Sequence, residues 1–491
     1  MTFDELTIFQ IDPKEPLTNF INGQFVAAKD VMDTIDPSTG EAWAQIPRSS
    51  PVEVSQAVKA AKAAFPAWST TSAQYRSSLL LKVAEIVEKH LDGFAVLESR
   101  DQGKPVALAK RIDIPRCIHN FRFFATAILH HTSKSTHQDE PIRAVNYVKH
   151  DPIGVAALIS PWNLPLYLLS FKLAPALATG NTVVFKPSEL TSVTSWVLMH
   201  AFVEAGFPPG VVNMVIGTGA EAGESLVIHP DVDIVSFTGS TVVGKRIAAL
   251  CGSQNKKISL EMGGKNACII YPSTDLEKAV PVITTSSFIN QGEICLCSSR
   301  IYVHESIFDE FLSKFVEAAK KFTVGDPRGP STLGAMNSEI HYNKVMGYIK
   351  LAEKEGGKIH CGGKAEIEGR CEKGYFIAPT IITGLDENSK CVQDEIFGPV
   401  VCVMPFSTRE EVISKANATP YGLSACVWSA ISEELHNTAG QLRVGTVWCN
   451  TWLTRDLNMP FGGTKQSGIG REGGEDSFHF FTEPKTICIA L

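Results

Sequence analysis

The sequence predicts an α/β protein built on a parallel sheet of the Rossmann type, with helices on both faces of the sheet. The first observation is an alternation of short β-branched runs with helix-like segments between residues 155 and 261. The second is a similar alternation between residues 267 and 322. The third is the length of 491 residues, which indicates two or three compact units rather than one small domain.

The amino-terminal part is expected to be helical after a short extended lead-in. Apolar residues at spacings of three and four predict one long helix with a single buried stripe, formed by Leu80, Val83, Val87, Leu91, Phe94 and Leu97. The residues 103–105 (GKP) interrupt this helix. A second apolar helix is expected from about Ile112 to His131.

The first alternation predicts five parallel strands, at residues 155–159, 182–185, 211–216, 234–237 and 257–261. Four helices separate them, at residues 164–178, 191–205, 221–228 and 241–250. In open sheets of this kind, ligands bind beyond the carboxyl ends of the strands. We therefore expect the segments 160–163, 186–189, 217–219 and 238–244 to converge on one crevice. The second alternation predicts strands at 267–270 and 301–304 and helices at 275–290 and 306–322.

The composition excludes several classes of protein. Hydrophobic residues make up 44% and charged residues 20% of the chain, as in ordinary globular proteins. The formal net charge of −7 comes without a basic stripe, so neither nucleic acid nor an anionic membrane is an expected partner. Residues 1–16 lack the features of a secretory signal, and no apolar stretch approaches the ~20 residues of a membrane span. The twelve cysteines are scattered, which favours a soluble cytosolic protein with reduced thiols.

The segment 290–297 (NQGEICLC) places Cys295 and Cys297 after a glycine turn. A thiol nucleophile needs thiolate character and an open approach, which a loop beside a crevice provides. Small buried cysteines are an alternative interpretation of the pair. A Cys-x-Cys metal corner is a third, but no second pair at ligand spacing accompanies it, so no metal is predicted.

Two further residues at strand ends suit acyl-transfer chemistry. Glu261, in the segment 260–266 (LEMGGKN), is a carboxylate beside backbone-permissive glycines, as a general base requires. A structural ion pair with Lys265 is the alternative. Asn163, in the segment 160–163 (SPWN), offers an amide to a developing oxyanion, an interaction worth ~3–4 kcal/mol in the transition state. A buried turn is the alternative for Asn163.

The segment 237–245 (FTGSTVVGK) follows a strand and opens a helix, whose first amides can bind a phosphate. Arg246 stands where a triphosphate-binding loop requires Ser or Thr, which excludes such a loop. Gly217, Gly219 and Gly223 do not have the spacing of the Gly-x-Gly-x-x-Gly motif either, so a dinucleotide bound in a nonstandard way remains.

The segment 185–189 (FKPSE) also lies at a strand end. Glu189 can accept both ribose hydroxyls and would repel a 2′-phosphate, which favours NAD over NADP. Lys186 can bond to the same ribose. A solvated ion pair between Lys186 and Glu189 is the alternative.

Together with 395–399 (EIFGP) and 460–463 (PFGG), these motifs resemble the aldehyde dehydrogenase superfamily from about Ile21 to the carboxyl terminus. The motifs occur in the family's order, and the separation of Glu261 from Cys295 (295 − 261 = 34 positions) also fits. The resemblance implies that Cys295 attacks the aldehyde while Asn163 and the Cys295 amide stabilise the oxyanion. Hydride then passes to the nicotinamide of NAD, and Glu261 activates the water that hydrolyses the thioester.

The resemblance also implies a set of cofactor-binding residues: Trp162, Lys186, Ser188, Glu189, Gly219, Gly223, Phe237, Gly239, Ser240, Gly244, Glu395 and Phe397. Of these, Glu395 and Phe397 match the positions for the nicotinamide ribose and ring.

The implied architecture is that of an aldehyde dehydrogenase. Residues 1–130 and 152–262 form the NAD-binding domain, residues 263–463 form the α/β catalytic domain, and residues 131–151 with 478–491 form a small β bridging arm. The family is usually dimeric or tetrameric. An exposed strand edge at 143–150 and 486–491 would need covering, so we expect a homo-oligomer.

Two departures from the family pattern matter for the nucleophile. Glu293 stands where Gln is usual and would raise the pKa of the thiol by like-charge repulsion if it points inward. Cys297 stands where a small residue is usual and would form a disulfide with Cys295 under oxidation, although the geometry at this separation is often strained.

Within the superfamily, four stretches resemble the 2-aminomuconic semialdehyde dehydrogenases of tryptophan breakdown, in the kynurenine pathway, and their 2-hydroxymuconic relatives. They are 113–124 (DIPRCIHNFRFF), 162–169 (WNLPLYLL), 291–297 (QGEICLC) and 455–461 (RDLNMPF). The resemblance implies that both departures recur in that branch. Arg116 and Arg455 are expected near the substrate tunnel, where an arginine can bind a substrate carboxylate with two parallel hydrogen bonds. Surface arginines without a substrate role are the alternative.

Two other functions compete. A broad-specificity aldehyde or retinal dehydrogenase would have an apolar tunnel without arginine anchors. A structural relative without activity would be expected to have lost at least one of Cys295, Glu261 and Asn163, yet all three are present.

Overall fold

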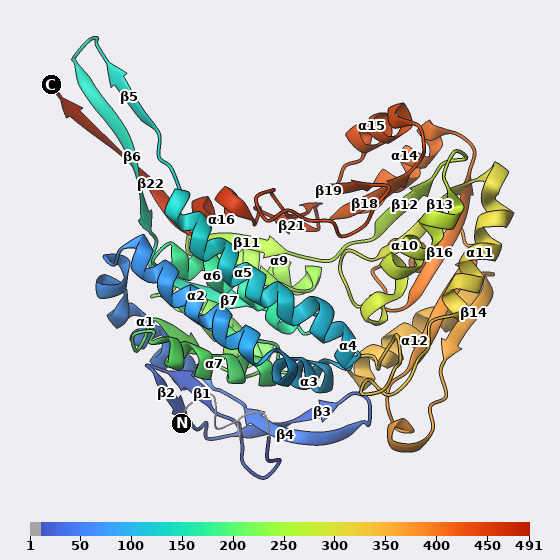
Figure 1. Ribbon diagram of the computed structural model, residues 1–491, viewed down its shortest axis with the longest axis horizontal. Helices are drawn as coiled ribbons and strands as arrows, with labels where there is room; N and C mark the ends of the chain where they lie inside the picture. Colours follow the sequence, from blue (N-terminus) through green and yellow to red (C-terminus); the bar gives the residue numbers. More distant parts are fainter. Residues whose placement is uncertain (1–10) are drawn as a thin grey trace.

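The computed structural model describes residues 11–491. Residues 1–10, the start of the expected cofactor domain and most of the segment judged not to be a signal, lie outside the described part. Figure 1 shows two α/β units side by side, with a narrow β arm that projects from the first unit. Within residues 11–491, no helix is both long and apolar enough to span a bilayer.

The first unit contains an eight-stranded sheet with the order β2-β1-β9-β8-β7-β10-β11-β21. The five expected strands form its parallel centre and are confirmed: β7 (Val155–Ile159), β8 (Thr182–Lys186), β9 (Val212–Met214), β10 (Ile234–Thr238) and β11 (Lys257–Glu261). Three short edge strands pair antiparallel and were not predicted: β1 (Asn19–Ile21), β2 (Gln24–Val26) and β21 (Gly468–Ile469). Strands of two or three residues are too short to carry an alternating pattern.

Helices follow the central strands where the alternation predicted them. They are α6 (Pro165–Ala178), α7 (Val193–Ala205), α8 (Glu224–Ile228) and α9 (Thr241–Gly252). A π-helical turn, Gly219–Gly223, precedes α8. Every residue of β7, β8 and β10 is buried, as expected for strands covered by helices on both faces.

The expected long amino-terminal helix is two helices, α2 (Ala73–Lys89) and α3 (Leu91–Gln102), which meet at His90. The prediction of one continuous helix was therefore wrong. His90 leaves the helical region with φ −112° and ψ 23°, yet the apolar stripe stays buried on both sides of it. Because both helices pack on the same core, the spacing of apolar residues does not reveal the break.

Other elements complete this unit. They are α1 (Pro51–Ser69), the hairpin strands β3 (Val31–Asp36) and β4 (Glu41–Pro47), α4 (Val106–Leu108), a π-helical turn Ala109–Asp113, α5 (Ile114–Ala127), a 3-10 turn Ile128–His130 and α16 (Gly474–Phe480). The predicted second apolar helix corresponds to α5 and its 3-10 extension.

The second unit contains a seven-stranded sheet with the order β14-β15-β16-β13-β12-β18-β19, parallel except for β14. Its strands are β12 (Asn266–Ile270), β13 (Ser298–His304), β14 (Lys358–Lys364), β15 (Ile377–Thr383), β16 (Val400–Phe406), β18 (Ser424–Trp428) and β19 (Thr446–Cys449). Its helices are α10 (Leu276–Phe288), α11 (Phe308–Lys320), α12 (Glu339–Lys354), α13 (Lys390–Gln393), α14 (Arg409–Asn417) and α15 (Ser432–Gln441). The strands and helices predicted between residues 267 and 322 are confirmed.

The arm is a three-stranded antiparallel sheet of β5 (Ser135–Gln138), β6 (Ala144–Pro152) and β22 (Thr482–Ala490). Strands β6 and β22 pair along their whole length, from Thr482 opposite Pro152 to Ala490 opposite Ala144. Figure 1 shows that the arm extends away from both α/β units. The two strands expected at residues 143–150 and 486–491 are therefore present and lie side by side.

Candidate active site

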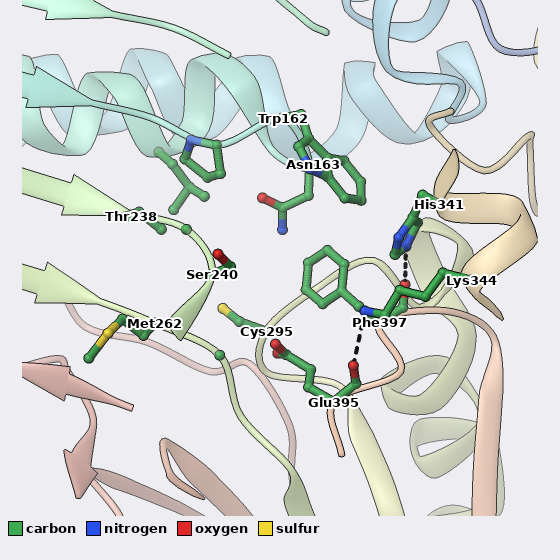
Figure 2. Close-up of a pocket in the computed structure, with 14 residues that line it drawn as sticks. Trp162, Asn163, Thr238, Ser240, Met262, Cys295, His341, Lys344, Glu395 and Phe397 are labelled. Carbon is green, nitrogen blue, oxygen red and sulfur yellow. Dashed lines mark hydrogen bonds between the residues drawn. The ribbon is translucent and has the colours of Figure 1, made fainter. Parts of the chain in front are cut away.

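A cavity of about 240 Å³ lies where the loops of the two α/β units meet. The loops after β7, β10 and β11 line it from the first unit, and segments before β13, within α12 and before β16 line it from the second. Figure 2 shows the lining side chains, which are Pro161, Trp162, Asn163, Leu168, Thr238, Gly239, Ser240, Met262, Gly263, Cys295, His341, Lys344, Glu395 and Phe397. The expected convergence of segments 160–163 and 238–244 is thus observed.

The other two segments expected at the crevice open on a second, smaller cavity of about 60 Å³. Lys186, Gly219, Gly223 and Phe237 line it, together with residues of α8 and α9. A Cβ atom on Gly239 would lie 2.5 Å from the Phe237 ring, so Phe237 of the second cavity packs directly under Gly239 of the first. The two cavities follow the carboxyl ends of the same parallel strands.

Cys295 is presented to the first cavity by a tightly held loop. Asn290, Gln291 and Gly292 have φ values of 55°, 56° and 70°, which turn the chain sharply after α10. A Cβ atom on Gly292 would lie 2.2 Å from the Gly398 carbonyl oxygen, so only glycine fits there. Asn266 Nδ2 donates to the carbonyl oxygens of Cys295 and Cys297, at 2.7 and 2.9 Å.

The surroundings of the Cys295 thiol favour its neutral form. Burial raises the pKa of Cys295 well above its ordinary value, and the carboxylates of Glu261 and Glu395 raise it further against the opposing charge of Arg455. A nucleophile in this state must lose its proton during the reaction. Glu293, which was expected to act on this thiol if it pointed inward, points away: its carboxylate accepts from Gln102 Nε2 at 2.7 Å and from the Asn337 amide at 3.0 Å.

Glu293 instead acts on the second cysteine. Its carboxylate helps burial raise the pKa of Cys297 to about 12. Cys297 lines only a small cavity of about 20 Å³ behind the loop, whereas Cys295 lines both that cavity and the larger one. No disulfide joins any of the twelve cysteines, all of which lie within residues 11–491. In the same range, no group of three or more His, Cys, Asp or Glu side chains is arranged to hold a metal.

Asn163 provides an amide beside the thiol. Its Nδ2 donates one hydrogen bond to the Glu293 carbonyl oxygen, at 2.8 Å. A primary amide has two N–H groups, so the second is available to the cavity. Figure 2 shows the Asn163 amide and the Cys295 thiol facing the same space. Among residues 11–491, the Cys295 backbone N–H has no hydrogen-bond acceptor, which leaves a second donor for an oxyanion.

Glu261 ends β11 but does not line the cavity. Its carboxylate lies next to Gly462, where a Cβ atom would be 3.1 Å from Oε1. Burial and then the charge of Glu472 raise the pKa of Glu261 to about 8, and Lys172 and Arg455 oppose this shift. The alternative pair with Lys265 is not formed, because Lys265 Nζ donates to the Cys391 carbonyl oxygen at 2.8 Å. Glu261 is therefore a weakly acidic carboxyl group next to the thiol loop.

Glu395 and Phe397 enter the first cavity from the loop before β16. Glu395 Oε1 accepts from the Gly264 amide at 2.9 Å, and a Cβ atom on Gly263 would lie 2.1 Å from Oε2. The Phe397 ring meets Trp162 edge to face, with 5.3 Å between the ring centroids. Figure 2 shows both side chains facing the cavity near Cys295.

Lys186 and Glu189 form an ion pair at 3.1 Å, but it is not the solvated pair considered above. The Lys186 side chain is only 3% exposed, and Nζ also donates to the carbonyl oxygens of Pro187 and Gly217 at 2.7 and 2.8 Å. Glu189 is one-third exposed and faces solvent. Lys186, which lines the second cavity, thus holds the Glu189 carboxylate in place.

The remaining predicted cofactor residues lie around these cavities. Ser240 caps α9 by accepting from the Val243 amide at 3.4 Å, and Gly244 packs against Met262. Gly219 has open space where a Cβ would be, and Gly223 lies against Lys186. Ser188 lines neither cavity; its hydroxyl accepts from the Leu190 amide at 3.3 Å.

Arg116 and Arg455 lie close together but line neither cavity. Arg116 is 5.2 Å from the Tyr167 ring centroid, and Arg455 is 3.7 Å from that of Phe461. Nε and Nη2 of both guanidinium groups are buried without a hydrogen-bond partner, and neither arginine forms an ion pair with any of the described residues. Burial lowers the pKa of Arg116, and the charge of Arg455 lowers it further.

These two arginines therefore form an electropositive site with unsatisfied donors. Leu168 of α6 lines the first cavity, while Tyr167 and Phe171 of the same helix lie under Arg116 and Arg455. Helix α6 thus connects the arginine pair to the cavity. Both arginines are only partly exposed, and their role toward the substrate stays a prediction.

Several residues at the site were not predicted from the sequence. His341 and Lys344 of α12 line the cavity, and His341 Nε2 bonds to the Phe397 carbonyl oxygen at 2.6 Å. Lys344 Nζ donates to the Glu395 carbonyl oxygen at 3.1 Å. On an amphipathic helix, the local sequence does not distinguish polar residues that line a site from polar residues that face solvent. Only the tertiary contacts identify the residues at the site.

Comparison with known proteins agrees with this geometry. Residues 25–487 match the model of the aldehyde dehydrogenase family. The chain is 53% identical over 477 residues to 2-aminomuconic semialdehyde dehydrogenase of Danio rerio, which covers 96% of this chain and 98% of that protein. It is 41% identical over 483 residues to 2-hydroxymuconic semialdehyde dehydrogenase of Pseudomonas sp. (strain CF600), covering 97% and 99%. The NAD+ complex of an aldehyde dehydrogenase from Bacillus cereus superposes with a TM-score of 0.94 at 38% identity, covering 98% of this chain and 97% of that one. The resemblance seen in the sequence motifs is confirmed.

Proposed function

Because the chain belongs to the aldehyde dehydrogenase family, we propose that it oxidises 2-aminomuconic 6-semialdehyde to 2-aminomuconate with NAD+. This reaction would place it in tryptophan catabolism by the kynurenine pathway. The observation that carries the substrate assignment is the arginine pair of Arg116 and Arg455, whose buried donors have no partner among the described residues. A substrate that bears a carboxylate as well as an aldehyde would satisfy these donors.

The donor set fits NAD+. Glu189 and Glu395 are carboxylates that can accept ribose hydroxyls, one beside each cavity, and the charge of Glu189 disfavours a 2′-phosphate. The amides at the start of α9, which Ser240 caps, suit a pyrophosphate. We propose that these groups bind NAD+ together with the other predicted cofactor residues, which are Trp162, Lys186, Ser188, Gly219, Gly223, Phe237, Gly239, Gly244 and Phe397. When bound, NAD+ supplies the hydride acceptor.

Cys295 is the proposed nucleophile. The thiol releases its proton to solvent, its sulfur attacks the aldehyde carbon, and the electron pair of the carbonyl bond moves to the oxygen, which becomes an oxyanion. The second N–H of Asn163 and the Cys295 backbone N–H are placed to stabilise that charge. Loss of hydride from the same carbon leaves a thioester on Cys295.

Glu261 is the proposed base for hydrolysis of the thioester. Because its pKa is raised to about 8, the Glu261 carboxylate is a stronger base than an ordinary carboxylate once it is deprotonated. Because its carboxylate lies by Gly462 rather than in the cavity, Glu261 reaches the thioester either by rotation of its side chain or through a water molecule.

We also infer the division of labour among the parts of the chain. Residues 1–130 and 152–262 bind the cofactor, residues 263–463 carry the nucleophile, and residues 131–151 with 478–491 join subunits in a homodimer or homotetramer. The exposed edge of the arm supports this assembly. Twelve unpaired thiols support a cytoplasmic location.

The first test compares substrates. We expect NADH formation with 2-aminomuconic or 2-hydroxymuconic semialdehyde to exceed that with a neutral aldehyde of similar length by at least about tenfold in kcat/KM, the gain expected from one charge-assisted contact. Absorbance of NADH follows the reaction. Equal rates, or a preference for the neutral aldehyde or for retinal, would return the substrate to the broad-specificity alternative.

The second prediction concerns the anchor itself. Arg455→Met, which keeps the bulk over Phe461 but removes the charge, is expected to lower kcat/KM for the acidic semialdehyde about 10- to 100-fold. The value for a neutral aldehyde should fall several-fold less, because that substrate has no carboxylate to bind and loses only the effect of the Arg455 charge on the pKa values of Cys295 and Glu261. Arg122→Met, which removes an exposed arginine paired with Glu88, is the matched control and should affect neither substrate. An equal loss on both substrates would contradict the anchor.

A further inference from the structure

We propose that Lys104 is a positioning residue for the reaction: its buried ammonium holds the peptide carbonyl of Asn163 and so aims the Asn163 amide at the oxyanion. The inference rests on the proposed function of Asn163 and extends it to a residue outside the cavity. Lys104 follows α3, directly after Gly103, whose left-handed φ of 100° ends that helix.

The ammonium of Lys104 is completely enclosed. The side chains of Lys104 and Asp113 are both 0% exposed, and Nζ lies 2.6 Å from Asp113 Oδ1. The Lys104 backbone is held as well, because its amide donates to Gln102 Oε1 at 3.0 Å and its carbonyl accepts from Ser99 Oγ at 2.6 Å. The position of Nζ is therefore determined on every side by protein groups.

The second hydrogen bond of Nζ reaches the active site. Nζ donates to the Asn163 carbonyl oxygen at 3.1 Å, and Asn290 Nδ2 donates to the same oxygen at 3.3 Å. Both donors come from other segments of the chain, so the peptide group of Asn163 is held from two directions. Since the side-chain amide of Asn163 shares its Cα with that peptide group, its direction depends on these bonds.

The same short segment also contacts the nucleophile loop. Gln102 Nε2 donates to Glu293 Oε2 at 2.7 Å, and the Glu293 carbonyl oxygen accepts from Asn163 Nδ2 at 2.8 Å. Residues 102–104 therefore bind both the Asn163 loop and the loop that carries Cys295. This arrangement fixes the oxyanion donors relative to the sulfur.

Stability alone is a poor explanation for this ion pair. A buried pair is often no more stabilising than apolar side chains of similar volume, because both charges lose their hydration. A second carboxylate, Glu98, is also fully buried near the pair, and burial followed by the charge of Asp113 raises its pKa to about 7. Two buried acids beside one lysine contribute little to stability, because all three charged groups lose hydration. The same arrangement does hold the Lys104 ammonium group in one position.

The test is a double-mutant cycle. Lys104→Met combined with Asp113→Asn removes the hydrogen bond to Asn163 together with both charges of the ion pair. We expect kcat to fall about 10- to 100-fold, the loss typical of a small misplacement of a catalytic group, while KM and NAD+ affinity change less than about twofold. In a protein that already carries Asn163→Ala, the same pair of substitutions should lower kcat by less than about a further threefold. The amide that Lys104 positions is already absent from that protein.

Glu98→Gln is the matched control. It removes a charge from the same buried cluster without touching the Asn163 carbonyl, and it should keep kcat within about twofold of the wild type. Thermal unfolding and NAD+ binding show that each variant is folded. If the Lys104/Asp113 variant does not fold, Lys104→Gln enters the same cycle under the same criteria.

A folded Lys104/Asp113 variant with the kcat of the wild type would overturn the inference. The inference would also fail if the loss in kcat from the Lys104/Asp113 pair were as large with Asn163→Ala present as without it. Neither result touches the proposed function. The dehydrogenase chemistry on which this inference rests fails only if the wild-type protein forms no NADH from any aldehyde, and the substrate assignment is tested separately by the comparison of acidic and neutral aldehydes.

Discussion

Replacing Cys295 with alanine is expected to lower NADH formation by at least about 10⁴-fold, because no thioester can form without the sulfur. NAD+ binding should stay within about twofold of the wild type, since the groups assigned to the cofactor keep their places. Steady-state absorbance measures the first quantity and calorimetric titration the second. The expected effect is the largest for any single residue of the site.

Cys297→Ala is the matched control for this prediction. Cys297 lies two positions away, but it faces only the small cavity behind the loop and has a pKa of about 12. We expect turnover within about threefold of the wild type. If Cys295→Ala retains activity near that of the wild type, the nucleophile is elsewhere, and Cys297 is the first residue to test.

Glu261→Gln is expected to lower the steady-state rate about 10²- to 10⁴-fold while leaving a rapid first turnover of one NADH per active site. Oxidation to the thioester does not need the base, whereas hydrolysis does, so the acyl-enzyme should accumulate. Stopped-flow absorbance detects the burst and mass spectrometry detects the added acyl group. Loss of the burst as well would mean that Glu261 acts before the thioester forms.

The pH dependence tests the same residue independently. Burial raises the pKa of Glu261 to about 8, so the carboxyl group is protonated below that pH and cannot accept a proton. The hydrolysis rate should therefore rise with pH through about 8 and level off above it. Glu261→Gln should abolish this rise.

Glu293→Gln provides the control for the pH profile. Burial also raises the pKa of Glu293 to about 8, but its carboxylate faces Gln102 and Asn337 rather than the thioester. This variant should keep the rise in rate near pH 8. If Glu293→Gln flattens the profile, the titration near pH 8 does not belong to Glu261, and the assignment is wrong.

The parallel sheet was predictable because its information is local. Strands β7 and β11 have the expected bounds. Strand β7 is apolar along its whole length because helices cover both of its faces. The edge strands β1, β2 and β21 and the break at His90 were not predictable, because they depend on which segments pack beside them. The spacing of apolar residues indicates which residues are buried, but not which segment of the chain packs against them.

The sequence by itself determined the family, the order of its motifs and the positions of Cys295, Asn163 and Glu261, because each motif is a short contiguous segment whose residues are read directly. Only the tertiary structure decided how those residues relate to one another. It turned Glu293 away from the thiol, placed the Glu261 carboxylate by Gly462, and brought Lys104 under Asn163 and Arg116 beside Arg455. Side-chain direction, burial and pKa depend on groups that are far apart in the chain, 59 positions in the case of Lys104 and Asn163, and folding alone brings such groups together.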